Sequence, residues 1–156
     1  TRTDRILFAA TKADHLHHSN HDRLEAILEH LVRRARDRAQ FSGARTDVVA
    51  LAALRATTEG EIKDGGETVS IVVGTPLEGE RLGDEVFDGK SRTGIFPGDL
   101  PADPTEVTDP KREADALRFI RFRPPEIKSE GEGITLSLPH IRLDRALNFL
   151  FGDHLE

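Results

Sequence analysis

The sequence predicts an α/β fold that begins with two parallel strands joined by a helix. Residues 6–10 (ILFAA) and 47–54 (DVVALAAL) are short apolar runs bounded by polar residues, which is typical of strands buried on both faces. The second run has a composition that a helix also allows, but its length favours a strand. Between them, residues 20–40 repeat apolar side chains every three or four positions, as an amphipathic helix does. Strand, helix and strand in this order predict a right-handed crossover between parallel strands.

The later part of the sequence predicts a mostly antiparallel β segment and a final helix. A glycine turn at residues 64–66 separates residues 61–63 from residues 67–73, which indicates a hairpin. Residues 74–112 are rich in Gly, Pro and Asp, so we expect loops with short strands there. The remaining expected elements are strands at residues 117–122 and 134–138 and a helix at residues 142–151.

Composition excludes several classes of function. The chain of 156 residues has no Cys, so it carries neither a disulfide framework nor a thiolate metal site. Its net charge of −6 argues against a nucleic-acid-binding protein, which usually has a basic footprint. No apolar run approaches the roughly 20 residues that span a bilayer, so we expect no direct membrane insertion. The chain contains no Met, and we expect Thr1 to be an internal residue of a longer protein.

A Thr-Lys-x-Asp motif ends the first predicted strand, at Thr11, Lys12 and Asp14. An ionised Asp accepts two hydrogen bonds at once, which suits the adjacent N1–H and amine donors of guanine. The aliphatic stem of Lys12 can cover one face of a flat ring. Ala56 and Thr57 follow the second predicted strand and offer a small-residue turn whose backbone N–H can meet the guanine O6. The alternative is that Lys12 and Asp14 are ordinary solvated residues at a strand end.

Three other groups of residues suggest different chemistry. Histidines crowd the loop after the motif and could bind Zn or Ni, but no carboxylate partner is fixed by spacing, so we favour an exposed loop: His15, His17, His18 and His21. Basic residues alternate with aromatic ones in a pattern that nucleic-acid-binding proteins use, although we favour core positions for the Phe residues: Arg118, Phe119, Arg121, Phe122 and Arg123. For His140 we favour a structural role at the entry to the final helix, because no nucleophile is tied to it.

Ordered blocks along the whole chain resemble one family. They lie at residues 7–14, 56–60, 96–98, 122–124, 138–144 and 146–153. In these blocks the sequence is similar to the carboxy-terminal part of the YcjX-like family of P-loop GTPases, which are bacterial and stress-associated. The resemblance implies the second half of a Ras-like P-loop domain at residues 1–58, an inserted β-rich subdomain at residues 59–138, and the last helix of the P-loop domain at residues 139–156.

The resemblance also implies a function and a setting. The parent protein would bind GTP or GDP and hydrolyse GTP, with Thr11, Lys12, Asp14, Ala56 and Thr57 recognising the base. Mg²⁺ and the phosphates would be held by upstream residues, because this chain has no Gly-x-x-x-x-Gly-Lys-Ser/Thr loop and no catalytic residue to assign; the fragment alone would be inactive. The implied location is the cytoplasm, peripheral at the inner membrane, beside a membrane-protein partner. Two alternatives stay open: a non-enzymatic interaction module for such a partner, or an ATPase of the same fold.

Overall fold

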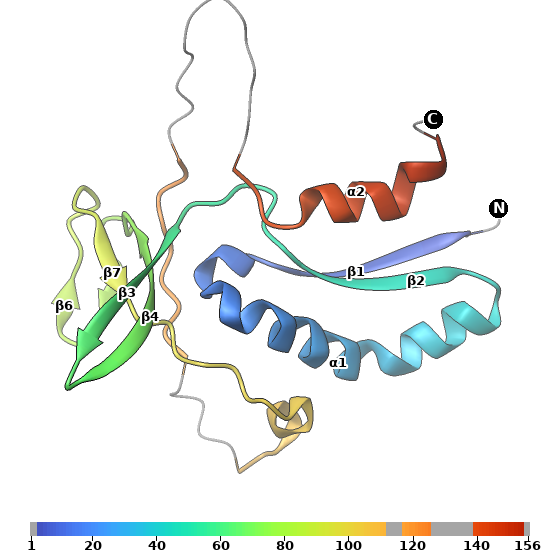
Figure 1. Ribbon diagram of the computed structural model, residues 1–156, viewed down its shortest axis with the longest axis horizontal. Helices are drawn as coiled ribbons and strands as arrows, with labels where there is room; N and C mark the ends of the chain where they lie inside the picture. Colours follow the sequence, from blue (N-terminus) through green and yellow to red (C-terminus); the bar gives the residue numbers. More distant parts are fainter. Residues whose placement is uncertain (1–2, 112–116, 126–138, 155–156) are drawn as a thin grey trace, which may run out of the picture.

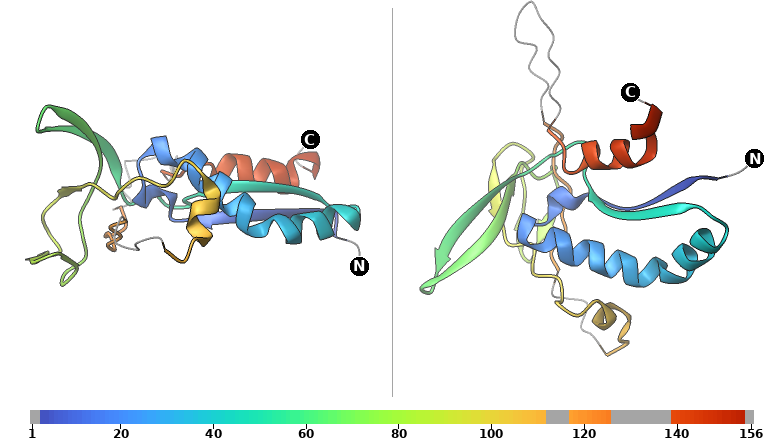
Figure 2. Two further views of the ribbon diagram at one scale, coloured as in Figure 1. Left: turned by 90° about the horizontal axis from the view of Figure 1, so that it is seen from below. Right: turned by 45° about the vertical axis from the view of Figure 1, so that its right-hand side comes forward.

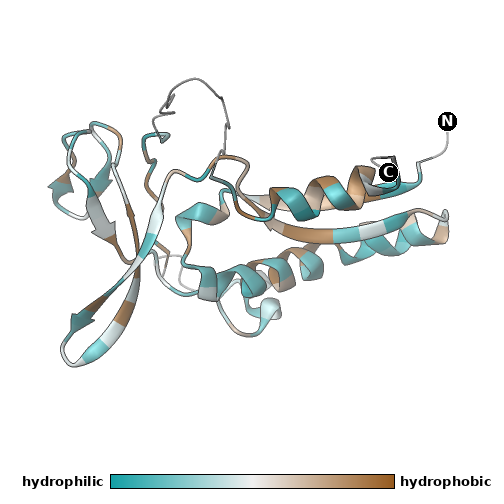
Figure 3. Ribbon diagram, turned by 45° about the horizontal axis from the view of Figure 1, so that its top comes forward, coloured by the Kyte–Doolittle hydropathy of each residue, from teal (hydrophilic) through white to brown (hydrophobic). Residues whose placement is uncertain are grey.

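The computed structural model describes residues 3–111, 117–125 and 139–154. Its α/β part contains β1 (Arg5–Thr11), α1 (His21–Phe41) and β2 (Arg45–Leu51). The two strands are parallel and in register from Arg5 opposite Arg45 to Thr11 opposite Leu51, which confirms the predicted parallel pairing. α2 (Leu143–Phe151) confirms the predicted final helix. The two helices lie on opposite sides of the strand pair (Figure 1), and Figure 3 shows apolar residues along the strands between them.

The β-rich part is built on a three-stranded antiparallel sheet. β3 (Thr58–Asp64) pairs with β4 (Glu67–Gly74), which pairs in turn with β7 (Thr93–Ile95). The hairpin predicted around the glycine turn is therefore confirmed, and Gly65 and Gly66 both take the positive φ angles that favour glycine. β5 (Arg81–Leu82) and β6 (Glu85–Val86) form a small second hairpin. This part lies at the end of the molecule away from the two termini (Figure 2).

Short 3-10 segments connect these elements: η1 (Ala13–His15), η2 (His18–Asn20), η3 (Pro104–Thr108) and η5 (Gly152–His154). The buried apolar residues of the β-rich part form one cluster: Val72, Phe87, Ile95, Ile120 and Phe122. In the α/β part, one cluster joins the motif loop to β2 and the segment before α2: Ala13, Ala50, Ala52 and Ile141. Another joins α1 to residue 100: Leu16, Ile27 and Leu100. These clusters fix both strand ends that carry the predicted site.

Two predicted strands differ from the structure. Residues 117–122 form no strand, because the Arg121 N–H donates to the Glu80 carboxylate and not to the backbone of the segment opposite. Phe122 and Pro76 form only an isolated bridge, with backbone bonds from Leu77 to Arg121 and from Arg123 to Thr75. The strand predicted at residues 47–54 ends at Leu51, since the next residue, Ala52, pairs with Ile141 instead. The strand expected at residues 134–138 lies outside the described residues.

The edge of β2 that faces away from β1 is covered by side chains and by one backbone bridge. Ala50 donates its N–H to the Glu25 carboxylate of α1 at 2.8 Å. Arg145 of α2 donates to the carbonyl oxygen of Val48 at 3.1 Å, and also pairs with Glu25 and Asp47. Ala52 exchanges two backbone hydrogen bonds with Ile141. Both helices therefore satisfy the backbone groups of a strand that would otherwise present an open edge.

Candidate functional site

The motif turn begins at Lys12, directly after β1. Lys12 has a left-handed backbone (φ 61°, ψ 36°), which is uncommon for a residue other than glycine. This conformation turns the chain from the strand into η1, where Ala13 is fully buried. The N–H of His15 closes the turn on the Lys12 carbonyl oxygen at 3.0 Å. Backbone strain of this kind is often found at ligand-binding sites.

Asp14 is buried and bonded directly to the second predicted turn. Its side chain is only 4% exposed, and its carboxylate Oδ2 accepts the backbone N–H of Ala56 at 2.8 Å. The hydroxyl of Thr57 donates to the backbone carbonyl oxygen of Asp14, and Thr57 itself is 3% exposed. Two hydrogen bonds thus join Asp14 to Ala56 and Thr57, which lie 42 and 43 positions later in the sequence. The structure brings Asp14, Ala56 and Thr57 together.

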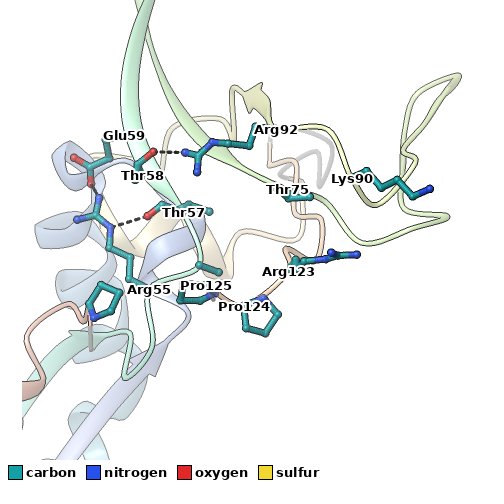
Figure 4. A pocket seen from close by; sticks show the side chains of 12 residues that line it. Arg55, Thr57, Thr58, Glu59, Thr75, Lys90, Arg92, Arg123, Pro124 and Pro125 are labelled. Carbon is teal, nitrogen blue, oxygen red and sulfur yellow. Dashed lines mark hydrogen bonds and ion pairs between the residues drawn. The ribbon is translucent and has the colours of Figure 1, made fainter. Parts of the chain in front are cut away.

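A cavity of about 770 Å³ opens beside Ala56 and Thr57 (Figure 4). Its walls carry four cationic side chains and one carboxylate: Arg55, Lys90, Arg92, Arg123 and Glu59. Arg55 pairs with Glu59 at 3.1 Å and donates to the Thr57 carbonyl oxygen, while Arg92 donates to the Thr58 hydroxyl. Lys90 and Arg92 come from the loop before β7, and no local sequence pattern predicted their position here.

Thr11 and Lys12 line a different cavity, of about 240 Å³. Its other walls come from the motif loop, α1 and the segment at residues 119–121: His15, Leu16, Leu24, Phe119, Ile120 and Arg121. Of the five predicted base-recognition residues, Ala56 and Thr57 line the first cavity and Thr11 and Lys12 line the second. Asp14 lines neither of them, because its buried carboxylate is turned toward Ala56. Phe119 is 56% exposed, so the expectation of a core position is wrong for this residue, whereas Phe122 is buried as expected.

The four histidines after the motif have three different environments. His15 packs edge-on against the ring of Phe122, with the ring centroids 5.4 Å apart, and burial lowers its pKa. His21 is buried at the start of α1, where Nε2 lies 2.9 Å from the carbonyl oxygen of Ala13. The rings of His17 and His18 contact each other at a tilt of 41°, with their centroids 4.2 Å apart. The expectation of one exposed loop is therefore wrong for His17 and His21, which are buried.

His17 and His18 also meet a carboxylate that the spacing could not reveal. Glu59 lies on β3, and its Oε2 is 2.7 Å from Nδ1 of His18. Burial by itself would raise the pKa of Glu59, but the hydrogen bond from His18 and the charge of Arg55 hold it below its ordinary value. Glu59 is 41 positions from His18, so no local pattern in the sequence connects them.

The arrangement defines a class of protein. Two turns that follow neighbouring parallel strands meet at the carboxyl ends of those strands, which is the edge where open α/β sheets bind ligands. The chain is thus an α/β protein with a candidate ligand site at that edge.

Comparison with known proteins identifies the family. A model of the YcjX-like family (DUF463) matches residues 1–155, and the chain belongs to this family. It is 38% identical over 154 residues to a protein of Escherichia coli named Ras-like GTPase YcjX, and 32% identical over 157 residues to one of that name from Shewanella oneidensis. The alignments cover 98% and 99% of this chain but 29% of each relative. The chain therefore spans less than a third of the length of these relatives.

The structure bears on the membrane in one respect. Within residues 3–111, 117–125 and 139–154, no helix has both the length and the apolar character that crossing a bilayer requires. The membrane-protein partner and the location at the inner membrane stay predictions.

Proposed function

We propose that this chain is the base-recognition part of a longer guanine-nucleotide-binding protein that hydrolyses GTP. The relatives that carry the name Ras-like GTPase support this function, as does the Thr-Lys-x-Asp motif at the end of β1. In this proposal residues 1–58 and 139–156 belong to a P-loop domain and residues 59–138 are inserted into it. The fold described above agrees with that division, because α2 returns to the strand pair: Arg5 of β1 donates to the Phe149 carbonyl oxygen at 2.6 Å.

One observation carries the proposal, namely the hydrogen bond between the Ala56 N–H and the Asp14 carboxylate. Guanine presents an acceptor, O6, next to two donors, N1–H and the exocyclic amine. A backbone N–H and a carboxylate held side by side form the complementary pattern of one donor and two acceptors. In the structure these two groups are hydrogen-bonded to each other at 2.8 Å. Guanine would separate them and replace one internal bond by three to the base.

The remaining base-recognition residues have supporting roles in this proposal. The stem of Lys12 covers one face of the ring and keeps its ammonium in water. Thr11 ties the end of β1 to neighbouring backbone. The Thr57 hydroxyl, bonded to the Asp14 carbonyl oxygen, fixes the distance between the two turns. Mg²⁺, the phosphates and the attacking water would be held by upstream residues, because the sequence contains no phosphate-binding Gly-x-x-x-x-Gly-Lys-Ser/Thr loop.

The substitution Asp14→Asn tests the proposal by changing the preferred base. Xanthine carries a carbonyl at C2 where guanine carries an amine, so an amide side chain pairs with xanthine and mismatches guanine. In the longer protein we expect GDP affinity to fall by more than about 100-fold, since about 3 kcal/mol of charge-assisted bonding is lost. We expect XDP affinity to rise. Fluorescent-nucleotide titrations of GDP, XDP and ADP measure both changes.

A matched variant separates base recognition from general damage. Asp64→Asn removes an exposed carboxylate at the end of β3 that is farther from the Ala56 turn, and should leave all three affinities unchanged. If Asp14 only supports the Ala56 turn, Asp14→Asn either lowers the affinities for GDP and XDP equally or leaves both unchanged. Equal competition by ADP and GDP for the unsubstituted protein would contradict the guanine preference and support an ATPase instead.

A further inference from the structure

Three side chains with metal-binding atoms meet between the motif loop and β3. One ring nitrogen each from His17 and His18 and one carboxylate oxygen of Glu59 all lie within 4.8 Å of one another. We propose that these three residues form a binding site for a divalent transition-metal ion, with Zn²⁺ as the best match. This proposal is independent of the guanine site, because it concerns different side chains and a different ligand.

The donor set has the chemistry of known sites. Imidazole nitrogen and carboxylate oxygen are ligands that Zn²⁺ prefers, and two His with one Glu leave a fourth tetrahedral position for water. Imidazole also suits Ni²⁺ and Co²⁺, so these ions serve as probes of the same site. The 2.7 Å contact between His18 Nδ1 and Glu59 Oε2 is a hydrogen bond. A metal ion would take the place of the shared proton.

The groups around the three ligands already hold two of them in position. Nδ1 of His17 lies 2.9 Å from the Ser19 hydroxyl and 3.4 Å from the Ser19 N–H. Nδ1 accepts from the Ser19 N–H in the structure, so binding an ion through Nε2 requires the other tautomer, in which Nδ1–H donates to the Ser19 hydroxyl instead. The two carboxylate oxygens of Glu59 have different partners: Oε1 pairs with Arg55 at 3.1 Å, and Oε2 contacts His18. Metal ligands are usually oriented by such outer hydrogen bonds.

Burial and charge set the expected strength of the site. His17 is buried, the Glu59 side chain is 22% exposed and the His18 side chain is 68% exposed, so an ion reaches the cluster from the His18 side. Arg55 places a positive charge beside the Glu59 carboxylate and opposes a second cation there. We therefore expect weaker binding than at a closed site with four thiolate ligands.

Metal binding would link two segments that are far apart in the sequence. His17 and His18 follow Asp14 in the motif loop, and Glu59 follows Thr57 and Thr58 at the start of β3. An ion bound by all three residues would link the motif loop to the start of β3, and so hold together the two segments that carry Asp14 and Ala56. Since the site exists only when both segments are in place, binding should stabilise the folded chain by mass action.

Titration of the full chain with ZnCl₂ by calorimetry tests the site, with Co²⁺ absorption reporting the coordination geometry. We expect one Zn²⁺ per chain and a rise in the unfolding temperature. His18→Ala and Glu59→Gln should each weaken Zn²⁺ binding by at least about tenfold, because even outer partners of metal ligands contribute 10–100-fold. His30→Ala, which removes a histidine of α1 outside the cluster, should bind Zn²⁺ as the unsubstituted chain does.

Two results would overturn the proposal: no Zn²⁺ binding to the unsubstituted chain, or equal binding by the Glu59→Gln variant and the unsubstituted chain. Circular dichroism shows whether each variant keeps its fold. Glu59→Gln conserves the size and hydrogen-bonding reach of the side chain, so it tests the ligand even where His18→Ala loosens the loop. Nucleotide binding is absent from these measurements, so a failure of the metal site leaves the guanine proposal untouched, and the reverse also holds.

Discussion

The backbone of Lys12 is strained at the point where the motif leaves β1. A left-handed backbone is unfavourable by roughly 1–2 kcal/mol for a residue with a Cβ atom, and glycine avoids that cost but loses more entropy on folding. We predict that Lys12→Gly stabilises the folded chain by about 0.5–1 kcal/mol, which is the backbone strain relieved minus the entropy that glycine loses. The same variant should weaken GDP binding to the longer protein, because the stem that covers the base is removed.

Chemical denaturation of the chain and nucleotide titration of the longer protein measure the two effects of Lys12→Gly. Lys63→Gly serves as the comparison, since Lys63 lies within β3 and glycine weakens a strand. A loss of stability in Lys12→Gly would show that the lysine side chain makes contacts that outweigh its backbone strain. Unchanged GDP affinity would remove Lys12 from the base site.

Asp88 gives the chain a defined response to acid. Its carboxylate accepts backbone N–H groups from Ser91 and Lys90 and the Ser91 hydroxyl, and these bonds lower its pKa from 3.8 to about 2. Because the unfolded chain binds the proton more readily, the contribution of Asp88 is complete above about pH 4 and is lost as the pH falls toward 2. Urea unfolding at pH 5, 3 and 2 should show a shallower acid loss for Asp88→Asn; parallel curves for both proteins would contradict this role.

At the scale of elements, regular periodicity was the reliable signal. The buried strands, the amphipathic helix α1 and the glycine hairpin follow from patterns within a few neighbouring residues. Residues 117–122 show the limit of such patterns, because strand formation depends on the partner, and here a side chain, the Glu80 carboxylate, takes the Arg121 N–H that a strand would have used. The same limit applies to the site. The motif predicted that Asp14 and Ala56 recognise the same base, so it placed them near each other. The contact between Glu59 and His18 depends on how distant segments fold together, which no local spacing encodes.

The β-rich part depends on close packing between β4 and the segment that carries Phe122. A Cβ atom at Gly74 would lie 2.6 Å from the Phe122 ring, which is nearer than real Cβ contacts come. Phe122 belongs to the buried cluster and also contacts the His15 ring, so it has little freedom to move. We predict that Gly74→Ala lowers the free energy of unfolding by about 1–3 kcal/mol, as overpacked cores do.

Denaturation curves measure the effect of Gly74→Ala, with Gly79→Ala as a contrasting variant. Gly79 has open space around its Cβ position but a positive φ of 81°, so its substitution tests backbone strain without a clash. A second substitution, Phe122→Leu, should recover part of the stability lost in Gly74→Ala, because the smaller side chain makes room. Absence of any such coupling would show that the clash with Phe122 is not the cause.

At the scale of the whole molecule, the two strands of the parallel pair differ in whether the backbone groups on their outer edges have hydrogen-bond partners. Glu25, Arg145 and Ile141 satisfy the outer backbone groups of β2. Among the residues that the structure describes, no hydrogen bond beyond those with β2 and its adjoining residues reaches the backbone of β1. Parallel sheets rarely end in an open, apolar strand, since such an edge invites pairing with another strand. The open edge of β1 therefore supports the proposal that further strands of a P-loop domain continue the sheet there.

Hydrogen exchange tests this continuation at named amides. The Asp4 carbonyl oxygen accepts from Arg45 on the β2 side, and alternation along the strand then turns the N–H groups of Leu7 and Ala9 to the outer edge. We predict that both amides exchange rapidly in the 156-residue chain and become protected in the longer protein. Val49 is fully buried with its N–H directed toward β1, so its amide should be protected in both. Equally fast exchange of Leu7 and Ala9 in the longer protein would place its remaining strands elsewhere, because a strand paired to β1 must hold those hydrogens.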